Sequence, residues 1–133
     1  MSTNSNKIVF LGGTCNNSQW REKLIPLLSI GYFNPVVENW TPECQEAEIK
    51  ARETSDYVLY VITPKMTGVY SIAEVVDDSN KRPEKTVFAY LLEDDTATFE
   101  AHQVKALKAT AKLVESNGAK VAFSLEEVAE LLK

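Results

Sequence analysis

The sequence predicts an α/β fold in which a parallel sheet is covered by helices on both faces. Short apolar runs alternate with helical patterns along the chain, which indicates this class of fold. The run "YVLYVIT" at 57–63 is apolar on both faces, as is typical of a strand in the middle of a parallel sheet. With 133 residues, 44% of them apolar, the chain has the length of one domain. We therefore expect a single domain over residues 1–133, with residues 1–6 frayed.

The N-terminal half is predicted to contain strands at 7–11 and 32–40 and helices at 18–29 and 41–55. Ser18 or Asn17 could cap the first helix, and Pro26 falls inside its apolar pattern, where it would kink the helix or end it early. Thr41 followed by Pro42 is a good start for the second helix, because threonine caps and proline suits the first helical position.

The C-terminal half is predicted to contain strands at 57–63, 86–92 and 119–123 and helices at 71–80, 99–117 and 124–133. Ser71 is expected at or near the N-cap of its helix, and Gly118 is expected to end the helix before it. The acidic segment "EDDTAT" at 93–98 is expected to be a long loop. This order predicts a three-layer flavodoxin/Rossmann-like sandwich around a five-stranded, mostly parallel sheet.

Composition excludes several classes of function. The net charge of −5 without a Lys/Arg cluster argues against a nucleic acid polymer as partner, although a single nucleotide remains compatible. No apolar stretch predicts a membrane span or a signal peptide, so we expect no membrane partner. Cys15 and Cys44 are expected to be reduced in a cytoplasmic protein. With His102 as the single histidine, neither a metal site nor a cofactor is expected.

Ligands of open parallel sheets bind beyond the carboxyl ends of the strands, which selects the loops 12–17, 34–42 and 63–71. The first loop, "GGTCNN", leads into a helix N-terminus, where glycines allow a close approach and the helix dipole favours an anion. It matches neither a Walker motif nor the Rossmann glycine fingerprint. Its glycines could equally serve only to make the turn, and the sequence leaves these two interpretations open.

Glu74 is the carboxylate that the third loop brings to this edge, in the predicted first turn of its helix. Four apolar residues surround it in the sequence, so we expect partial desolvation, which is common among functional acids. The alternative is an ordinary helix-start carboxylate that stabilises the helix dipole. The helix 41–55 carries further glutamates, and spacing alone does not choose which of them points into the cleft. His102 is interpreted as a surface or packing residue.

Three stretches taken in order carry a resemblance to a known family: "VFLGGTCNNSQWREKLIPLL", "YFNPVVENWTPECQEAEIKARETSDYVLYVITP" and "GVYSIAEV". With these stretches the chain resembles the nucleoside 2-deoxyribosyltransferase-like family, which includes deoxynucleoside 5′-monophosphate N-glycosidases. The resemblance covers roughly residues 7–92 and implies a nucleoside or nucleotide substrate. It also implies a homo-oligomer, such as a dimer, because pockets of this family are often completed by a neighbouring subunit.

The resemblance also implies residue roles. Glu74 corresponds to the nucleophilic glutamate, which traps the sugar as a glycosyl ester. The second carboxylate falls on Glu48, or on Glu46 if the helix register shifts. The remaining expected substrate-binding residues, which cover the sugar, phosphate and base sides of the pocket, are Gly12, Gly13, Thr14, Asn16, Asn34, Trp40, Gly68, Tyr70 and Ser71.

Two departures from the family pattern keep other functions open. Gly68 stands where transferases have an acid that contacts the base, and Thr14, Cys15 and Asn16 replace an aromatic hydroxyl found in some of them. The first hypothesis is an N-glycosidase or deoxyribosyltransferase that uses Glu74. The alternative is a non-catalytic module that binds a nucleoside or nucleotide as a sensor. A third interpretation is a protein-interaction domain whose cleft is filled by its own aromatic side chains.

Overall fold

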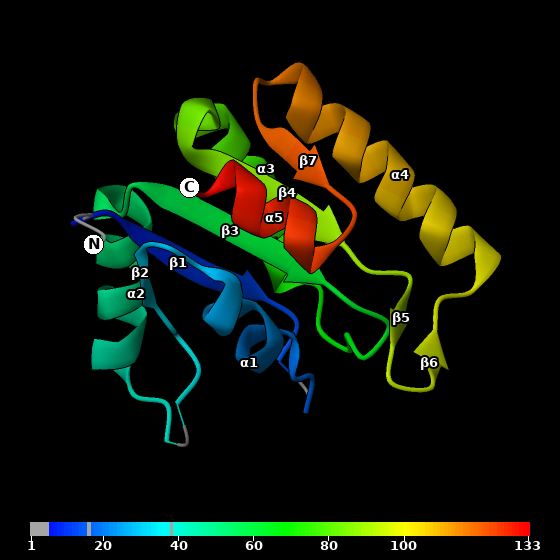
Figure 1. The fold of residues 1–133 in the computed structure, drawn as a ribbon, viewed down its shortest axis with the longest axis horizontal. Coiled ribbons are helices and arrows are strands. Elements are labelled where there is room, and N and C mark those ends of the chain that lie inside the picture. Colours follow the sequence, from blue (N-terminus) through cyan, green and yellow to red (C-terminus); the bar gives the residue numbers. More distant parts are fainter. Residues whose placement is uncertain (1–5, 16, 38) are drawn as a thin grey trace.

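The computed structural model describes residues 6–15, 17–37 and 39–133, so residues 1–5 of the predicted frayed segment 1–6 lie outside the described part. Five strands form one sheet in the order β2-β1-β3-β4-β7, and every pairing in it is parallel (Figure 1). The strands are β1 (Ile8–Gly13), β2 (Gly31–Phe33), β3 (Tyr57–Ile62), β4 (Thr86–Tyr90) and β7 (Lys120–Ala122). The central strand is β3, which confirms the prediction made from its apolar faces.

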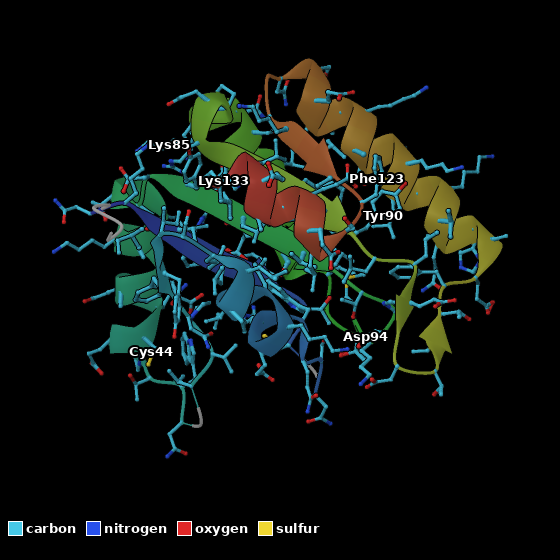
Figure 2. The ribbon with its side chains drawn as sticks, viewed as in Figure 1. Cys44, Lys85, Tyr90, Asp94, Phe123 and Lys133 are labelled. Atoms are coloured by element: carbon cyan, nitrogen blue, oxygen red, sulfur yellow. The ribbon has the colours of Figure 1, made fainter. Side chains whose placement is uncertain are left out.

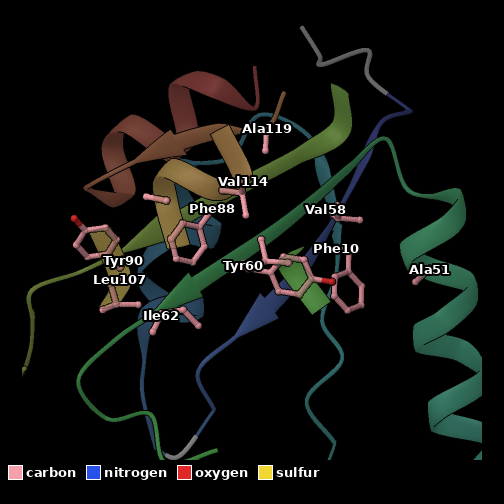
Figure 3. Close-up of a cluster of buried hydrophobic side chains, with 12 residues drawn as sticks. Phe10, Ala51, Val58, Tyr60, Ile62, Phe88, Tyr90, Leu107, Val114 and Ala119 are labelled. Atoms are coloured by element: carbon pink, nitrogen blue, oxygen red, sulfur yellow. The ribbon is translucent and has the colours of Figure 1, made fainter. Parts of the chain in front are cut away.

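Helices cover both faces of the sheet, which confirms the predicted three-layer sandwich. The helices are α1 (Trp20–Leu24), α2 (Pro42–Thr54), α3 (Tyr70–Lys81), α4 (Ala101–Ser116) and α5 (Leu125–Leu131). Figure 1 shows α1 and α5 in front of the sheet, and Leu59 and Val61 of β3 belong to the same buried cluster as apolar residues of these helices. The alternate residues Tyr60 and Ile62 belong to the other cluster, with residues of α2, α3 and α4 (Figure 3).

Several helices begin or end at capping residues that the sequence predicted. The Thr41 hydroxyl accepts a hydrogen bond from the backbone N–H of Cys44, and Pro42 is the first residue of α2. The last helix was predicted over 124–133, and α5 begins one residue later, with Ser124 as its N-cap. Gly118 follows the end of α4 with φ = 111°, a conformation that glycine adopts without steric cost. These predictions are confirmed.

The predicted cap of the first helix was wrong, and Ser71 lies near the N-cap of α3 but not at it. Gln19 occupies the N-cap of α1, and the hydroxyl of Ser18 donates a hydrogen bond to Asp94. Val69 occupies the N-cap of α3, so Ser71 lies inside the helix and not at its cap. Glu74 therefore lies in the second turn of α3 rather than the first, beyond the strongest effect of the helix dipole.

The first predicted helix is shorter than expected. It was predicted over 18–29, but α1 ends at Leu24 and continues as a single 3₁₀ turn over Ile25–Leu27. Pro26 explains this, because it has no N–H group to continue the α-helical hydrogen-bond ladder. Of the two effects considered for Pro26, it ends the helix early.

The acidic segment 93–98 was predicted as a loop, and this was wrong. It folds into an antiparallel hairpin of two short strands, β5 (Glu93–Asp94) and β6 (Ala97–Thr98), that lies beyond the end of the sheet (Figure 1). A two-residue strand is too short to produce a recognisable alternation of apolar and polar residues. The sequence pattern therefore could not reveal this hairpin.

The fold opens a crevice where β1 and β3 lie side by side. The chain leaves β1 for α1 on one face of the sheet and leaves β3 for α3 on the opposite face (Figure 1). Parallel sheets bind ligands at such a switch point, outside the carboxyl ends of the strands. In the described part of the chain, no helix combines the length and apolar character needed to cross a membrane.

Candidate active site

A cavity of about 300 Å³ lies at this crevice, and it collects side chains from separate segments of the chain. Its walls are formed by Phe10, Gly12, Gly13, Cys15, Arg21, Pro35, Val36, Val37, Trp40, Glu48, Tyr70, Ser71 and Glu74. All three strand-end loops selected from the sequence therefore contribute residues to the lining of this cavity.

The structure brings seven of the predicted site residues to this cavity: Gly12, Gly13, Trp40, Glu48, Tyr70, Ser71 and Glu74. Thr14 and Gly68 line an adjoining cavity of about 140 Å³ that also contacts Tyr70 and Ser71. Asn34 lines a third cavity of about 280 Å³, and its side-chain oxygen accepts a hydrogen bond from the N–H of Val36. Asn16 lies outside the described residues.

Glu74 is a largely buried carboxylate in the wall of the cavity, with 14% of its side chain exposed. Burial raises the pKa of Glu74 to about 7, and the negative charges of Glu48, Asp78 and Asp77 act in the same direction. Arg52 opposes this shift, with its Nη1 atom 3.7 Å from Oε2 of Glu74. The Glu74 carboxyl group therefore titrates near neutral pH.

Arg52 is held in place by two aspartates of α3. Its Nε donates to Oδ2 of Asp78 at 3.2 Å, and its Nη2 donates to Oδ1 of Asp78 and to Oδ2 of Asp77, both at 3.0 Å. Asp78 is fully buried and also accepts hydrogen bonds from Tyr60, at 2.6 Å, and from Arg82. Burial alone would lower the pKa of Arg52, but the hydrogen bonds and negative charges around it raise the pKa overall. The guanidinium stays charged beside the cavity.

The helix register selects Glu48 as the second carboxylate. Among the glutamates of α2, Glu48 is half-buried and lines the cavity, whereas Glu46 is exposed and is not among the lining residues. The negative charge of Glu48 also raises the pKa of Glu74, although less than burial does. The cavity thus carries two carboxylates with different surroundings, an arrangement that can divide nucleophilic and proton-transfer roles.

Part of the cavity lining is apolar. Phe10, Pro35, Val36, Val37 and Trp40 supply its surface. Trp40 is 57% exposed, so its ring lies at the rim and does not fill the space. A cavity that combines apolar lining residues with two carboxylates suits a ligand that has an aromatic ring and polar groups.

Arg21 is a cavity residue that sequence reasoning missed. It is 3% exposed and donates hydrogen bonds to the carbonyls of Leu11, at 3.0 and 3.1 Å, and of Thr14, at 2.8 Å. Its guanidinium lies 4.4 Å from the centre of the Trp20 ring. Burial lowers the pKa of Arg21, and the neighbouring Cys15 acts in the opposite direction. The partners of Arg21 are main-chain carbonyls, so no side-chain pattern in the sequence points to this role.

The two glycines are part of β1, and not of the loop in which the sequence analysis placed them. Gly13 has φ = 121°, and a Cβ atom there would lie 2.1 Å from the carbonyl oxygen of Val61. A Cβ atom at Gly12 would lie 2.6 Å from the ring of Tyr60. Close packing of β1 against β3 therefore requires both glycines, whether or not a ligand approaches them.

A comparison with protein families supplies an independent finding. A family model described as "Nucleoside 2-deoxyribosyltransferase like" matches residues 6–90, which is more than half of the chain. The matched region contains β1 through β4 and all three loops at the crevice. A comparison with curated proteins finds no match. Among the described residues, no group of three or more His, Cys, Asp or Glu side chains could hold a metal ion.

Proposed function

The chain belongs to the nucleoside 2-deoxyribosyltransferase-like family, and from this premise we propose that it cleaves the N-glycosidic bond of a nucleoside or nucleotide through Glu74. One observation carries the proposal. Glu74 is a largely buried carboxylate that shares a cavity of about 300 Å³ with Glu48, at the edge of the sheet where such folds bind ligands.

In the proposed reaction, the ionised carboxylate of Glu74 attacks C1′ of the sugar. The bond from C1′ to the base nitrogen breaks, and its electron pair leaves with the base, which takes up a proton. The product is a glycosyl ester on Glu74. Water, or a nitrogen of a second base, then attacks C1′ and releases the carboxylate, so that two inversions give net retention. Glu48 is proposed to assist the proton transfers.

The surroundings of the two carboxylates support these roles. Arg52 keeps a positive charge 3.7 Å from Glu74, which favours the carboxylate that attacks and that is released again in the second step. The apolar wall with Trp40 at its rim is proposed to hold the base. The end of β1, which Arg21 holds in shape, is proposed to support the sugar.

A second candidate function is a sensor that binds a nucleoside or nucleotide without cleaving it. Gly68 favours it, because this residue has no side chain where family transferases have an acid that contacts the base, and a Cβ atom there would meet no atom within 4 Å. The protein-interaction interpretation is less favoured. Trp40 and Tyr70 are 57% and 71% exposed, and they leave the cavity open.

The test is release of free base from a panel of deoxynucleosides and their monophosphates, followed by chromatography. We expect release with at least one substrate and loss of at least about a thousandfold in kcat for Glu74→Gln. Glu48→Gln should also slow the reaction, whereas the matched control Glu46→Gln should not. Full base release by Glu74→Ala would exclude the proposed mechanism. Thermal stabilisation by a ligand without any turnover would favour the sensor.

A further inference from the structure

Asp94 is a buried carboxylate on the β5–β6 hairpin, outside the segment 6–90 that matches the family. It is 7% exposed, although its hairpin lies at the surface beyond the sheet. Figure 2 shows Asp94 next to the loop that follows β3. None of the roles assigned to the cavity residues explains why an acid is buried here.

One oxygen of Asp94 accepts hydrogen bonds from two loops that are distant in the sequence. The hydroxyl of Ser18, in the loop after β1, donates to Oδ2 at 2.5 Å. The hydroxyl of Thr63, at the end of β3, donates to the same oxygen at 2.7 Å. Hydrogen bonds to an ionised carboxylate are stronger than those between neutral groups, so this oxygen is a firm attachment point for both loops.

Lysine balances part of the charge of this cluster. Nζ of Lys65 lies 3.9 Å from Oδ1 of Asp94 and 2.5 Å from Oδ2 of Asp95, which is exposed. The same ammonium group donates to the carbonyl of Asn17 at 3.4 Å. The loop after β3 therefore contacts both the hairpin and the loop after β1 at this point.

The cluster connects directly to the edge of the cavities. The N–H of Thr63 donates to the hydroxyl of Thr14 at 3.0 Å. The carbonyl of Thr14 in turn accepts from Arg21, at 2.8 Å, and from Trp20, also at 2.8 Å. Thr14 and Gly68, from the two loops, both line the adjoining cavity of about 140 Å³. We call this adjoining cavity, lined by Thr14 and Gly68, the mouth of the site. A change at Asp94 therefore reaches residues that shape the mouth.

We propose that Asp94 is a positioning residue that fixes the loops after β1 and β3 relative to each other, so that the β5–β6 hairpin sets the shape of the substrate-binding mouth. The predicted effect of Asp94 on catalysis rests on the proposed function. The attachment of the two loops to Asp94 does not depend on the proposed function. Asp94 contacts Ser18, Thr63 and Lys65 and is not among the lining residues of the cavity that holds Glu74 or of the adjoining cavity, so we assign it no part in the chemical step.

The test compares Asp94→Asn with Glu93→Gln, a matched control on the same hairpin whose side chain is exposed and lies outside the cluster. Loosening of the mouth should raise KM about tenfold or more in Asp94→Asn, because small displacements of positioning groups have large kinetic effects. The pH profile that reports Glu74 should stay in place. A defect in folding alone would reduce the active fraction, and hence kcat, and would leave KM unchanged. Glu93→Gln should keep the wild-type KM.

A second measurement needs no substrate. Hydrogen–deuterium exchange should become faster in peptides that cover residues 13–18 and 63–69 of Asp94→Asn, with no change in α5. Ser18→Ala should accelerate exchange in residues 13–18, and adding Asp94→Asn should have less effect than in the wild type, because both changes break the same bond.

Each outcome decides the proposal. An unchanged KM, or exchange that rises only within residues 93–98, would overturn it. If the wild-type protein were inactive with every substrate, the proposed function alone would fail. The exchange pattern would then still support or overturn the holding of the two loops by Asp94.

Discussion

Arg21, which is buried, and Arg52, which is partly buried, lie near the cavity and have opposite kinds of partners. Arg52 is surrounded by carboxylates, and the hydrogen bonds to Asp78 raise its pKa in spite of burial. Arg21 is surrounded by main-chain carbonyls, and burial lowers its pKa. The difference indicates two tasks. The charge of Arg52 acts on Glu74, whereas the planar shape of Arg21 fixes the backbone at the end of β1.

Arg52→Met should show the largest effect on stability. It would leave the fully buried Asp78 with fewer positive partners, which should lower the free energy of unfolding by about 3–5 kcal/mol. Arg52→Lys keeps a charge and should lose markedly less. Urea unfolding measures both variants. Equal losses for lysine and methionine would show that charge is not what matters at this position.

The pH dependence of the stability of Glu74→Gln tests the electrostatic surroundings of Glu74, on which Arg52 acts. Burial raises the pKa of Glu74 from 4.5 to about 7 in the folded protein, so folding favours its protonated form. The resulting contribution to stability is fully present below pH 4.5 and is lost as the pH rises through 7. Glutamine cannot ionise, so its contribution does not change with pH. The free energy of unfolding of the variant minus that of the wild type should therefore be about 2–3 kcal/mol higher at pH 8 than at pH 5. A difference that does not change with pH would contradict the raised pKa.

The effect of replacing Arg21 on stability should depend on the shape of the new side chain and not on its charge. Arg21→Met should lower the free energy of unfolding by about 2 kcal/mol, because the carbonyls of Leu11 and Thr14 lose their buried donors. Arg21→Lys should lose nearly as much, since an ammonium group cannot reach both carbonyls in the same way. Chemical denaturation of the two variants provides the measurement. Full stability of Arg21→Lys would mean that Arg21, like Arg52, acts mainly through its charge.

Gly68→Ala should have the smallest effect. A Cβ atom at Gly68 would meet no atom within 4 Å, in contrast to Gly13, where it would meet the backbone of β3. The free energy of unfolding should change by less than about 0.5 kcal/mol. Thermal unfolding of Gly68→Ala beside Gly13→Ala is the check, and a large loss for Gly68→Ala would show that its loop is packed more tightly than the structure indicates.

The fold was predictable because it depends on patterns within short segments. The apolar run 57–63 identified the central strand, and Thr41 with Pro42 identified the start of α2. The hairpin at 93–98 escaped because two-residue strands leave no pattern. Ser18 does not cap α1, and its hydrogen bond to Asp94, 76 residues away in the sequence, leaves no local pattern.

The candidate site was predictable in part for the same reason. The position of Glu74 followed from the loop after β3, and the family resemblance suggested Glu48, which the helix register places in the cavity wall. Arg52 and Arg21 could not be found in this way. Their partners are residues of another helix and main-chain carbonyls, and only the folded chain brings these together. The roles of all these residues in catalysis stay predictions.

The central claim is that Glu74 forms a covalent bond with the sugar. Incubation with a fluorinated deoxynucleoside, followed by digestion and mass spectrometry, tests it most directly, because fluorine slows breakdown of a glycosyl ester. We predict one added fluorosugar on the peptide that contains Glu74, and none in Glu74→Gln. Base release by the wild-type protein without any such adduct, or an adduct on another residue, would contradict the claim.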